Sequence, residues 1–179
     1  MRKVSDELIL QTAEWLAERD SNVTLATIGQ KLGVSHAALY RYFKNKDELW
    51  TAVMQRWFKR EILEKITLAK SYPMAKMALK DWLQQFSAYK KTLYTENSCL
   101  AQRNIQYIDN RIPSLQVVLQ PAYAEINRLM DYPPGQYAKA EAILAVFTVF
   151  LLPDFKETWD YPDYKERFET FWQLIEPGL

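Results

Sequence analysis

The sequence TLATIGQKLGVSHAALYRYFKNKDEL, residues 24–49, decides the fold of the N-terminal part of the chain. Thr24 is suited to cap a short helix, because its hydroxyl can accept a hydrogen bond from a first-turn amide. Gly33 follows that helix, and a glycine just past a helix end readily adopts the left-handed conformation that stops it. Ser35 can then cap a second short helix. Gly29 lies inside the first of the two helices, where a residue without a side chain indicates a close contact. The pattern predicts two short helices joined by a tight corner.

Charge is distributed unevenly around this stretch. Residues 21–46 contain no Asp or Glu, whereas they contain Lys31, Arg41, Lys44 and Lys46. Phosphate oxygens are bound by cationic, N–H or O–H donors, and a nearby carboxylate would repel them. The absence of acids therefore favours a surface that meets a polyanion, although a solvated face without acids could also arise by chance.

The composition favours an all-α protein. The chain has 179 residues, of which 49% are hydrophobic, enough for a sizeable core. It has only four glycines, whereas β-sandwiches and barrels need many glycine-rich turns. The net charge of +1 says little about partners on its own.

Cellular location is indicated by several features of the sequence. The single cysteine, Cys99, excludes an internal disulfide and fits a reducing cytosol. The thiol of Cys99 could be inert and packed in the core, or it could act as a redox sensor. The N-terminus has no long apolar stretch typical of a signal peptide, and the longest apolar run, residues 142–153, is too short to span a bilayer. We expect a cytoplasmic protein without a membrane partner.

Hydrophobic periodicity and capping residues predict about nine helices and no strand. A capped helix begins after Ser5, and Asn45 is expected to cap a long helix, with Glu48 in the capping-box position. Pro121 is expected to kink or split the helix that contains it. The expected helices after the corner lie at about 45–65, 74–94, 100–108, 114–130, 136–152 and 162–176.

The N-terminal motif resembles that of the tetracycline-repressor (TetR) family over residues 5 to about 60. The resemblance is carried by the Thr24 cap, by GVS at 33–35, by LYRYF at 39–43 and by KNKDEL at 44–49. It departs from the family at Gly29, where the family usually has Ala. The resemblance implies a helix-turn-helix DNA-binding domain at 1–46, a connecting helix at 47–66 and a helical effector-binding and dimerisation domain at 67–179.

The same resemblance suggests which residues contact DNA. It places Thr24, Tyr40, Tyr42 and Lys46 at positions used largely for phosphate contact. Lys46 would lie in the first turn of the long helix, where backbone amides also attract anions. Base reading would fall to the exposed part of the second short helix, in which small side chains can meet a thymine methyl and His or Arg can donate to guanine. The predicted DNA-binding residues are Thr24, Ser35, His36, Ala37, Ala38, Tyr40, Arg41, Tyr42 and Lys46.

Some of these residues have other interpretations. The two tyrosines could pack in the core, but Leu39 and Phe43 are better core candidates, and the absence of acids favours DNA contact most clearly for Tyr40. His36 is the only histidine, so a histidine-rich metal site is excluded, and no acid lies near it in sequence to orient a catalytic ring. We predict no catalytic residue, no metal and no cofactor.

The C-terminal part contains aromatic residues that could line a cavity for a small hydrophobic or aromatic effector, or could simply form a helical core. The candidate pocket residues are Trp82, Phe86, Tyr89, Leu93, Tyr107, Tyr123, Phe147 and Phe150.

The helices at about 136–152 and 162–176 are apolar over much of their surface. A helix that is apolar all round must be covered on every side. Pairing with the same helices of a second chain would cover them and is how the family dimerises. The alternative is that neighbouring helices of the same chain cover them.

Together these features predict a TetR-type, ligand-responsive repressor that binds a pseudo-palindromic operator in double-stranded DNA as a homodimer. The alternative is a helical carrier or sensor of a hydrophobic ligand that does not act on DNA. An enzyme is disfavoured, because the sequence has no glycine-rich phosphate loop, metal-spaced cluster or histidine-based dyad. The operator, the target genes, the effector and the choice between repression and activation are not encoded in any recognisable motif.

Overall fold

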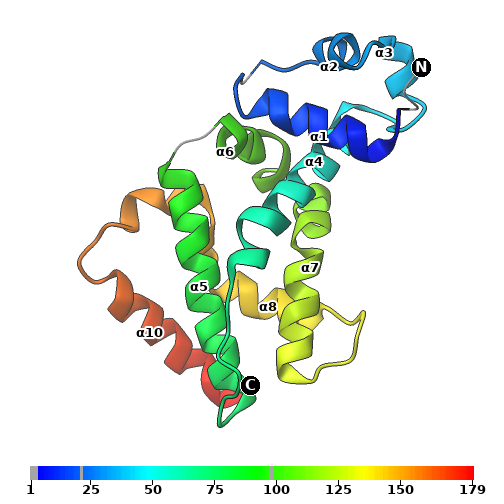
Figure 1. The fold of residues 1–179 in the computed structure, drawn as a ribbon. Helices are drawn as coiled ribbons and strands as arrows, with labels where there is room; N and C mark the ends of the chain where they lie inside the picture. The colour runs from blue at the N-terminus through cyan, green and yellow to red at the C-terminus, as the bar shows by residue number, and fades with distance from the viewer. Residues whose placement is uncertain (1–3, 21, 97–98) are drawn as a thin grey trace. The chain divides into compact units, whose positions relative to one another are not determined.

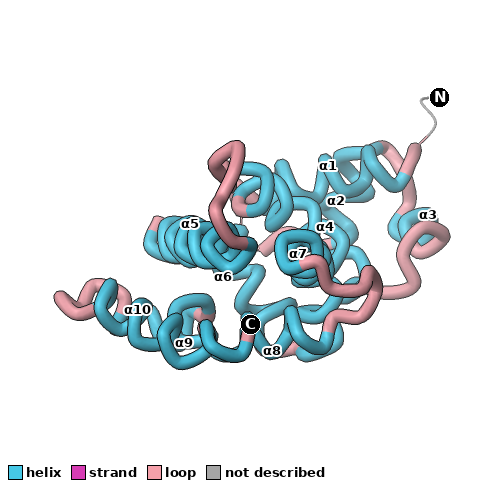
Figure 2. The backbone as a smooth tube through the Cα atoms, turned by 90° about the horizontal axis from the view of Figure 1, so that it is seen from below, coloured by secondary structure: helices cyan, strands magenta, loops and turns pink. Residues whose placement is uncertain are grey.

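The chain is described by a computed structural model, which covers residues 4–20, 22–96 and 99–179. In these residues every regular element is helical and no strand occurs, which confirms the predicted all-α class (Figures 1 and 2). Three 3₁₀ segments, Leu63–Lys65, Pro153–Thr158 and Glu176–Gly178, and a π-helical segment, Ile105–Asp109, supplement the α-helices. The α-helices are α1 Asp6–Ala17, α2 Leu25–Leu32, α3 His36–Leu39, α4 Lys46–Glu61, α5 Ala75–Thr95, α6 Cys99–Asn104, α7 Ile112–Met130, α8 Ala138–Val146, α9 Thr148–Leu151 and α10 Tyr164–Ile175.

The chain forms two compact units. The first comprises Met1–Phe58 and Asn97–Val118, and the second comprises Lys59–Glu96 and Leu119–Leu179. Helices α4 and α7 each begin in the first unit and end in the second. The functional domains expected from the sequence use other boundaries and stay a prediction. No helix in the described part of the chain is both long enough and apolar enough to cross a bilayer.

Local capping chemistry builds the first unit as the sequence predicts. The Ser5 hydroxyl accepts from the amide of Leu8, and the Thr24 hydroxyl accepts from the amide of Thr27. Gly33 ends α2 with φ +68°, the left-handed conformation that costs a side chain about 1–2 kcal/mol. The Asn45 side chain accepts from the amide of Glu48 at 2.7 Å. These contacts are short-range, so the sequence alone specifies them.

Gly29 makes the close contact expected of it. A Cβ at this position would lie 2.8 Å from the carbonyl oxygen of Val34, closer than any real Cβ approaches an oxygen. The backbone of the corner therefore packs directly on α2, and this close contact fixes where α3 begins.

The core of the first unit confirms the predicted division of the LYRYF segment. Leu39 is 2% exposed and Phe43 is 8% exposed, whereas Tyr40 and Tyr42 are on the surface. Helix α4 contributes two buried tryptophans to the unit, Trp50 and Trp57. The core therefore fixes which face of α3 points outward.

The predicted helix at 136–152 is wrong in one respect, because the structure breaks it into α8 and α9. Phe147 leaves the helical conformation with ψ +12°. The break allows Phe147 and Phe150 both to pack on Phe168 of α10, with ring centroids 4.9 and 5.4 Å away. Much of the apolar surface of this segment is thus covered within the chain.

Helix α7 continues through Pro121 instead of splitting there. A proline has no N–H, so the carbonyl of Val117, four residues earlier, lacks its usual helical donor. The side chain of Gln55 on α4 supplies one, with Nε2 3.1 Å from that oxygen. One turn earlier, the Thr51 and Ser114 hydroxyls lie 3.2 Å apart. The proline thus leaves an acceptor that joins α7 to α4.

Because Gln55 replaces a bond that Pro121 removes, the two residues should be coupled in stability. We expect Gln55→Ala to lower the free energy of unfolding by about 0.5–1.5 kcal/mol, the usual contribution of one hydrogen bond. In a Pro121→Ala background the amide of residue 121 can serve Val117 itself, so Gln55→Ala should cost less. A double-mutant cycle by urea denaturation measures the coupling. Equal losses in both backgrounds would contradict it.

Candidate nucleic-acid interface

The helix-turn-helix surface presents its polar side chains outward. Tyr40 and Tyr42 are 44% and 39% exposed, and His36 and Arg41 are also exposed. The remaining predicted residues are also exposed to solvent, with one exception. Thr24, Ser35, Ala37 and Lys46 are exposed, and Ala38 is half-buried. The structure therefore brings the predicted DNA-binding residues to the surface of α3, of the turn that follows it at 40–42, and of the starts of α2 and α4.

The four cations of the acid-free segment are available to a ligand. Among the described residues, no carboxylate forms an ion pair with Lys31, Arg41, Lys44 or Lys46. Other arginines of the same unit are paired, namely Arg19 with Glu18, Arg56 with Glu7 and Glu14, and Arg111 with Asp47. The first acid after the segment, Asp47, is thus already held by a cation, at 2.5 Å.

Lys46 occupies the first turn of α4, and its ammonium lies 5.4 Å from the centre of the Tyr107 ring. A cation at a helix N-terminus interacts unfavourably with the helix dipole, so Lys46 does not stabilise α4 in this way. The same position does suit a bound anion, because the ammonium and the positive end of the helix dipole can act together.

The two tyrosines differ in how their hydroxyls are used. The Tyr42 hydroxyl donates to the carbonyl of Val4 at 2.9 Å, a contact that the sequence did not indicate. Tyr40 instead meets His36 edge to face, with ring centroids 4.9 Å apart, and its hydroxyl bonds to none of the described residues. The Tyr40 hydroxyl is therefore available to donate to a ligand. The Tyr42 hydroxyl instead connects the segment before α1 to the turn after α3.

Arg103 supports this surface from α6, although sequence reasoning missed it. It is 4% exposed, and its guanidinium carbon lies 3.9 Å from the centre of the Trp50 ring. Its Nη1 lies 3.5 Å from the carbonyl of Val23, the residue before the Thr24 cap. Burial lowers the pKa of Arg103 from its usual value. No local sequence signal relates an arginine at 103 to a loop eighty positions earlier.

The predicted pocket residues fall into separate places. Tyr107 lies in the first unit beside Trp50, with ring centroids 6.0 Å apart. In the second unit, Trp82 stacks on Phe86 at 4.8 Å and also lines a pocket of about 300 Å³ beside Pro121. The others are distributed over the same unit. The Tyr89 hydroxyl donates to the carbonyl of Lys65, Leu93 is half-buried, Tyr123 faces Tyr137, and Phe147 and Phe150 pack on α10.

Known proteins share both the N-terminal sequence pattern and the fold. Residues 8–53 match the family described as bacterial regulatory proteins, tetR family. The fold is similar to that of a TetR transcriptional regulator from Rhodococcus sp. RHA1, with 21% identity, a TM-score of 0.63 and coverage of 94% of this chain and 93% of the other. It is also similar to a TetR-family transcriptional regulator from Streptomyces coelicolor, with 18% identity, a TM-score of 0.52 and coverage of 99% and 95%. No curated protein matches the sequence.

Proposed function

We propose that this chain, which belongs to the TetR family of transcriptional regulators, is a ligand-responsive repressor that binds a pseudo-palindromic operator as a homodimer. The observation that carries the proposal is the outward face of α3 and the start of α4. There, phenol, imidazole and cationic groups are exposed, and none of the four cations pairs with a described carboxylate. Such a surface fits the phosphates and base edges of a double strand.

The roles of the residues follow from their positions. Thr24, Tyr40 and Lys46 contact phosphates, and Tyr42 joins them once its hydroxyl exchanges Val4 for a phosphate oxygen. His36, at the start of α3, and Arg41, in the turn after it, donate to base edges, and the alanines between them, 37 and 38, allow α3 to lie deep in the major groove.

A second copy of the chain is needed to read both halves of the operator. We place the interface on α8 and α10, where Leu174 is 77% exposed although it is a large apolar residue. On α8, Ala142 and Ala145 are exposed and small, which permits close approach of another helix. Two-fold symmetry then requires half-sites about 34–36 Å apart, or a multiple of that spacing.

Ligand response requires that the effector bind the DNA-competent and incompetent states with unequal affinity. Helix α4 is the proposed lever, since it carries Lys46 at its start and continues into the second unit. Two contacts hold the lever in one position within the first unit. Asp47 pairs with Arg111, the residue before α7, and Thr51 contacts Ser114 in the first turn of α7.

Base reading by α3 can be tested by site selection. We expect Arg41→Met and His36→Ala to bind duplexes with an altered preferred sequence, each weakening discrimination at its own position by about 1–3 kcal/mol. Selection from a random duplex library, followed by sequencing, measures the preference. Lys156→Met serves as the matched control, because Lys156 is exposed on the second unit.

An unchanged selected sequence in both variants would refute base reading by these residues. A wild-type chain whose duplex affinity does not vary with salt would support the alternative of a ligand carrier that does not act on DNA.

A further inference from the structure

A groove of about 490 Å³ lies between α5 and α10 in the second unit. Its walls include Ser87 and Lys91 from α5 and Tyr164, Lys165 and Phe168 from α10. None of the eight aromatic or aliphatic residues predicted from the sequence to line a pocket belongs to this lining. The volume lies in the range of small-molecule sites.

Two hydroxyls in the groove lack a hydrogen-bond partner among the described residues. Ser87 is 1% exposed, and its Oγ forms no hydrogen bond with any described residue. The Tyr164 hydroxyl is likewise buried without a partner. Burial raises the pKa of Tyr164, so its phenol remains protonated and able to donate at neutral pH. A buried donor without an acceptor destabilises the unliganded chain, and a ligand with acceptor atoms would remove this cost.

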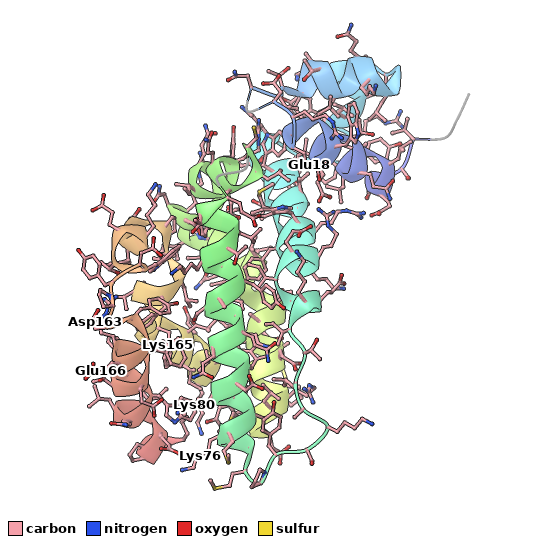
Figure 3. All side chains as sticks on the ribbon, turned by 60° about the vertical axis from the view of Figure 1, so that its left-hand side comes forward. Glu18, Lys76, Lys80, Asp163, Lys165 and Glu166 are labelled. Carbon is pink, nitrogen blue, oxygen red and sulfur yellow. The ribbon has the colours of Figure 1, made fainter. Side chains whose placement is uncertain are left out.

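The lysines of the groove leave positive charge for such a ligand. Lys165 is exposed on α10 and forms no ion pair with a described carboxylate (Figure 3). Lys91, on the opposite wall, donates to the carbonyl of Trp159 and to Asp160, whose side chain is 81% exposed and therefore well solvated. An anion in the groove would compete for Lys91 with the Trp159 carbonyl and with this solvated carboxylate.

The acid that lines the groove is already paired with a cation. Glu169 lines the groove, but its carboxylate lies 2.7 Å from the ammonium of Lys80, which reaches from α5 to α10 (Figure 3). Phe168 and the ring of Tyr164 supply an apolar floor, with Phe168 only 4% exposed. Hydrogen-bond donors and lysine ammonium groups thus form the polar part of the groove, and the rings of Tyr164 and Phe168 form its apolar floor.

We propose that this groove binds an amphipathic organic anion, namely an aromatic or short aliphatic carboxylate. Its carboxylate accepts hydrogen bonds from Ser87, Tyr164 and Lys165, and its apolar body lies on Phe168. Identification of this anion as the effector rests on the proposed repressor function, whereas its binding to the groove does not.

The binding test uses three naphthalene probes of nearly the same shape and different charge, namely 1-naphthoate, 1-naphthalenemethanol and 1-naphthylmethylamine. We expect isothermal titration of the full chain to detect naphthoate, with the alcohol binding at least about tenfold more weakly and the amine not at all, since a tenfold ratio corresponds to one good charged hydrogen bond. Equal binding of naphthoate and the alcohol, or no heat with naphthoate at millimolar concentration, would overturn the proposal.

Variants assign the binding to this groove. Lys165→Met and Ser87→Ala should each weaken naphthoate binding about tenfold, while Lys156→Met leaves it unchanged. Ser87→Ala should also raise the Tm of the unliganded chain, because it removes a buried hydroxyl without a partner. Higher stability together with weaker binding is the result expected of a ligand contact, and unchanged naphthoate affinity in both groove variants would place the probe elsewhere and overturn the assignment.

A separate measurement distinguishes this inference from the proposed function. Duplex binding is measured with and without naphthoate. Binding of naphthoate without any change in duplex affinity would support the groove and contradict its role in repression. Duplex binding by a chain that takes up no naphthoate would overturn the groove and leave the DNA-binding function intact.

Discussion

Replacing Arg56 with methionine is expected to lower the free energy of unfolding by about 3 kcal/mol. Glu14 is only 3% exposed in the core of the first unit, and its carboxylate lies 2.9 Å from Nε of Arg56. Methionine fills a similar volume but removes a cationic partner of a buried charge, a change that ranks among the most destabilising single substitutions. Chemical denaturation of the purified chain measures the loss.

Two controls separate charge from packing in this prediction. Arg56→Lys keeps the cation but loses the forked geometry, so it should cost less than methionine. Adding Glu14→Gln to Arg56→Met removes the buried charge as well, so the double variant should regain part of the lost stability. A midpoint for Arg56→Met equal to that of the wild type would show that this ion pair does not hold α1 to α4.

The same arginine makes stability depend on acidity. The hydrogen bond from Arg56, followed by that from Gln11, holds the pKa of Glu7 below its usual value of 4.5. A carboxyl with a lowered folded-state pKa contributes stability above its unfolded-state pKa and loses it as the pH falls through the lower, folded value. In Arg56→Met, Glu7 lacks the hydrogen bond from Arg56. The loss of stability that its protonation causes below about pH 4.5 should therefore be smaller than in the wild type. Denaturation curves at pH 3–7 for both proteins measure the difference.

The sequence predicted the first unit well because its determinants are local. Each cap joins a side chain to an amide three residues later, and the left-handed glycine at 33 acts on its own backbone. The sequence also favoured Leu39 and Phe43 over the two tyrosines as core residues, and both are buried. These features require no knowledge of distant parts of the chain, so reading the residues in order is sufficient.

Features that depend on distant residues were not predictable in this way. The Tyr42 hydroxyl bonds to Val4, thirty-eight positions earlier, and Arg103 lies on Trp50 from a helix beyond the whole of α5. The break at Phe147 exists because two rings of one segment meet Phe168 of another. In each case the deciding partner is brought near only by tertiary packing, which no local pattern records.

The candidate DNA surface was predictable in its residues but not in its details. Composition identified the acid-free segment, and the motif identified which side chains face outward. Neither showed that Asp47, the first acid beyond the segment, is held by Arg111, or that Tyr42 already has a partner in the free chain. Both contacts come from residues outside the motif.

The second large effect is expected on DNA binding, from reversing the charge of Lys46. Lys46→Glu should weaken binding to all duplexes at least about tenfold and reduce the slope of log affinity against log salt by about 0.9 or more, the value for one phosphate contact. Filter binding or fluorescence anisotropy at several salt concentrations measures both quantities. The control is Lys156→Glu, which changes the net charge equally on the second unit and should leave the slope unchanged.

Stability provides the decisive contrast for this variant. A glutamate in the first turn of α4 interacts favourably with the helix dipole, by about 0.3–1 kcal/mol, whereas loss of the ammonium over the Tyr107 ring costs a similar amount. The free energy of unfolding should therefore remain within about 0.5 kcal/mol of the wild type. If Lys46 held the fold together, stability and duplex affinity would fall in parallel. If its ammonium serves a phosphate, affinity falls while stability does not, because the stability that the Tyr107 contact gives is offset by the unfavourable position of a cation at a helix start.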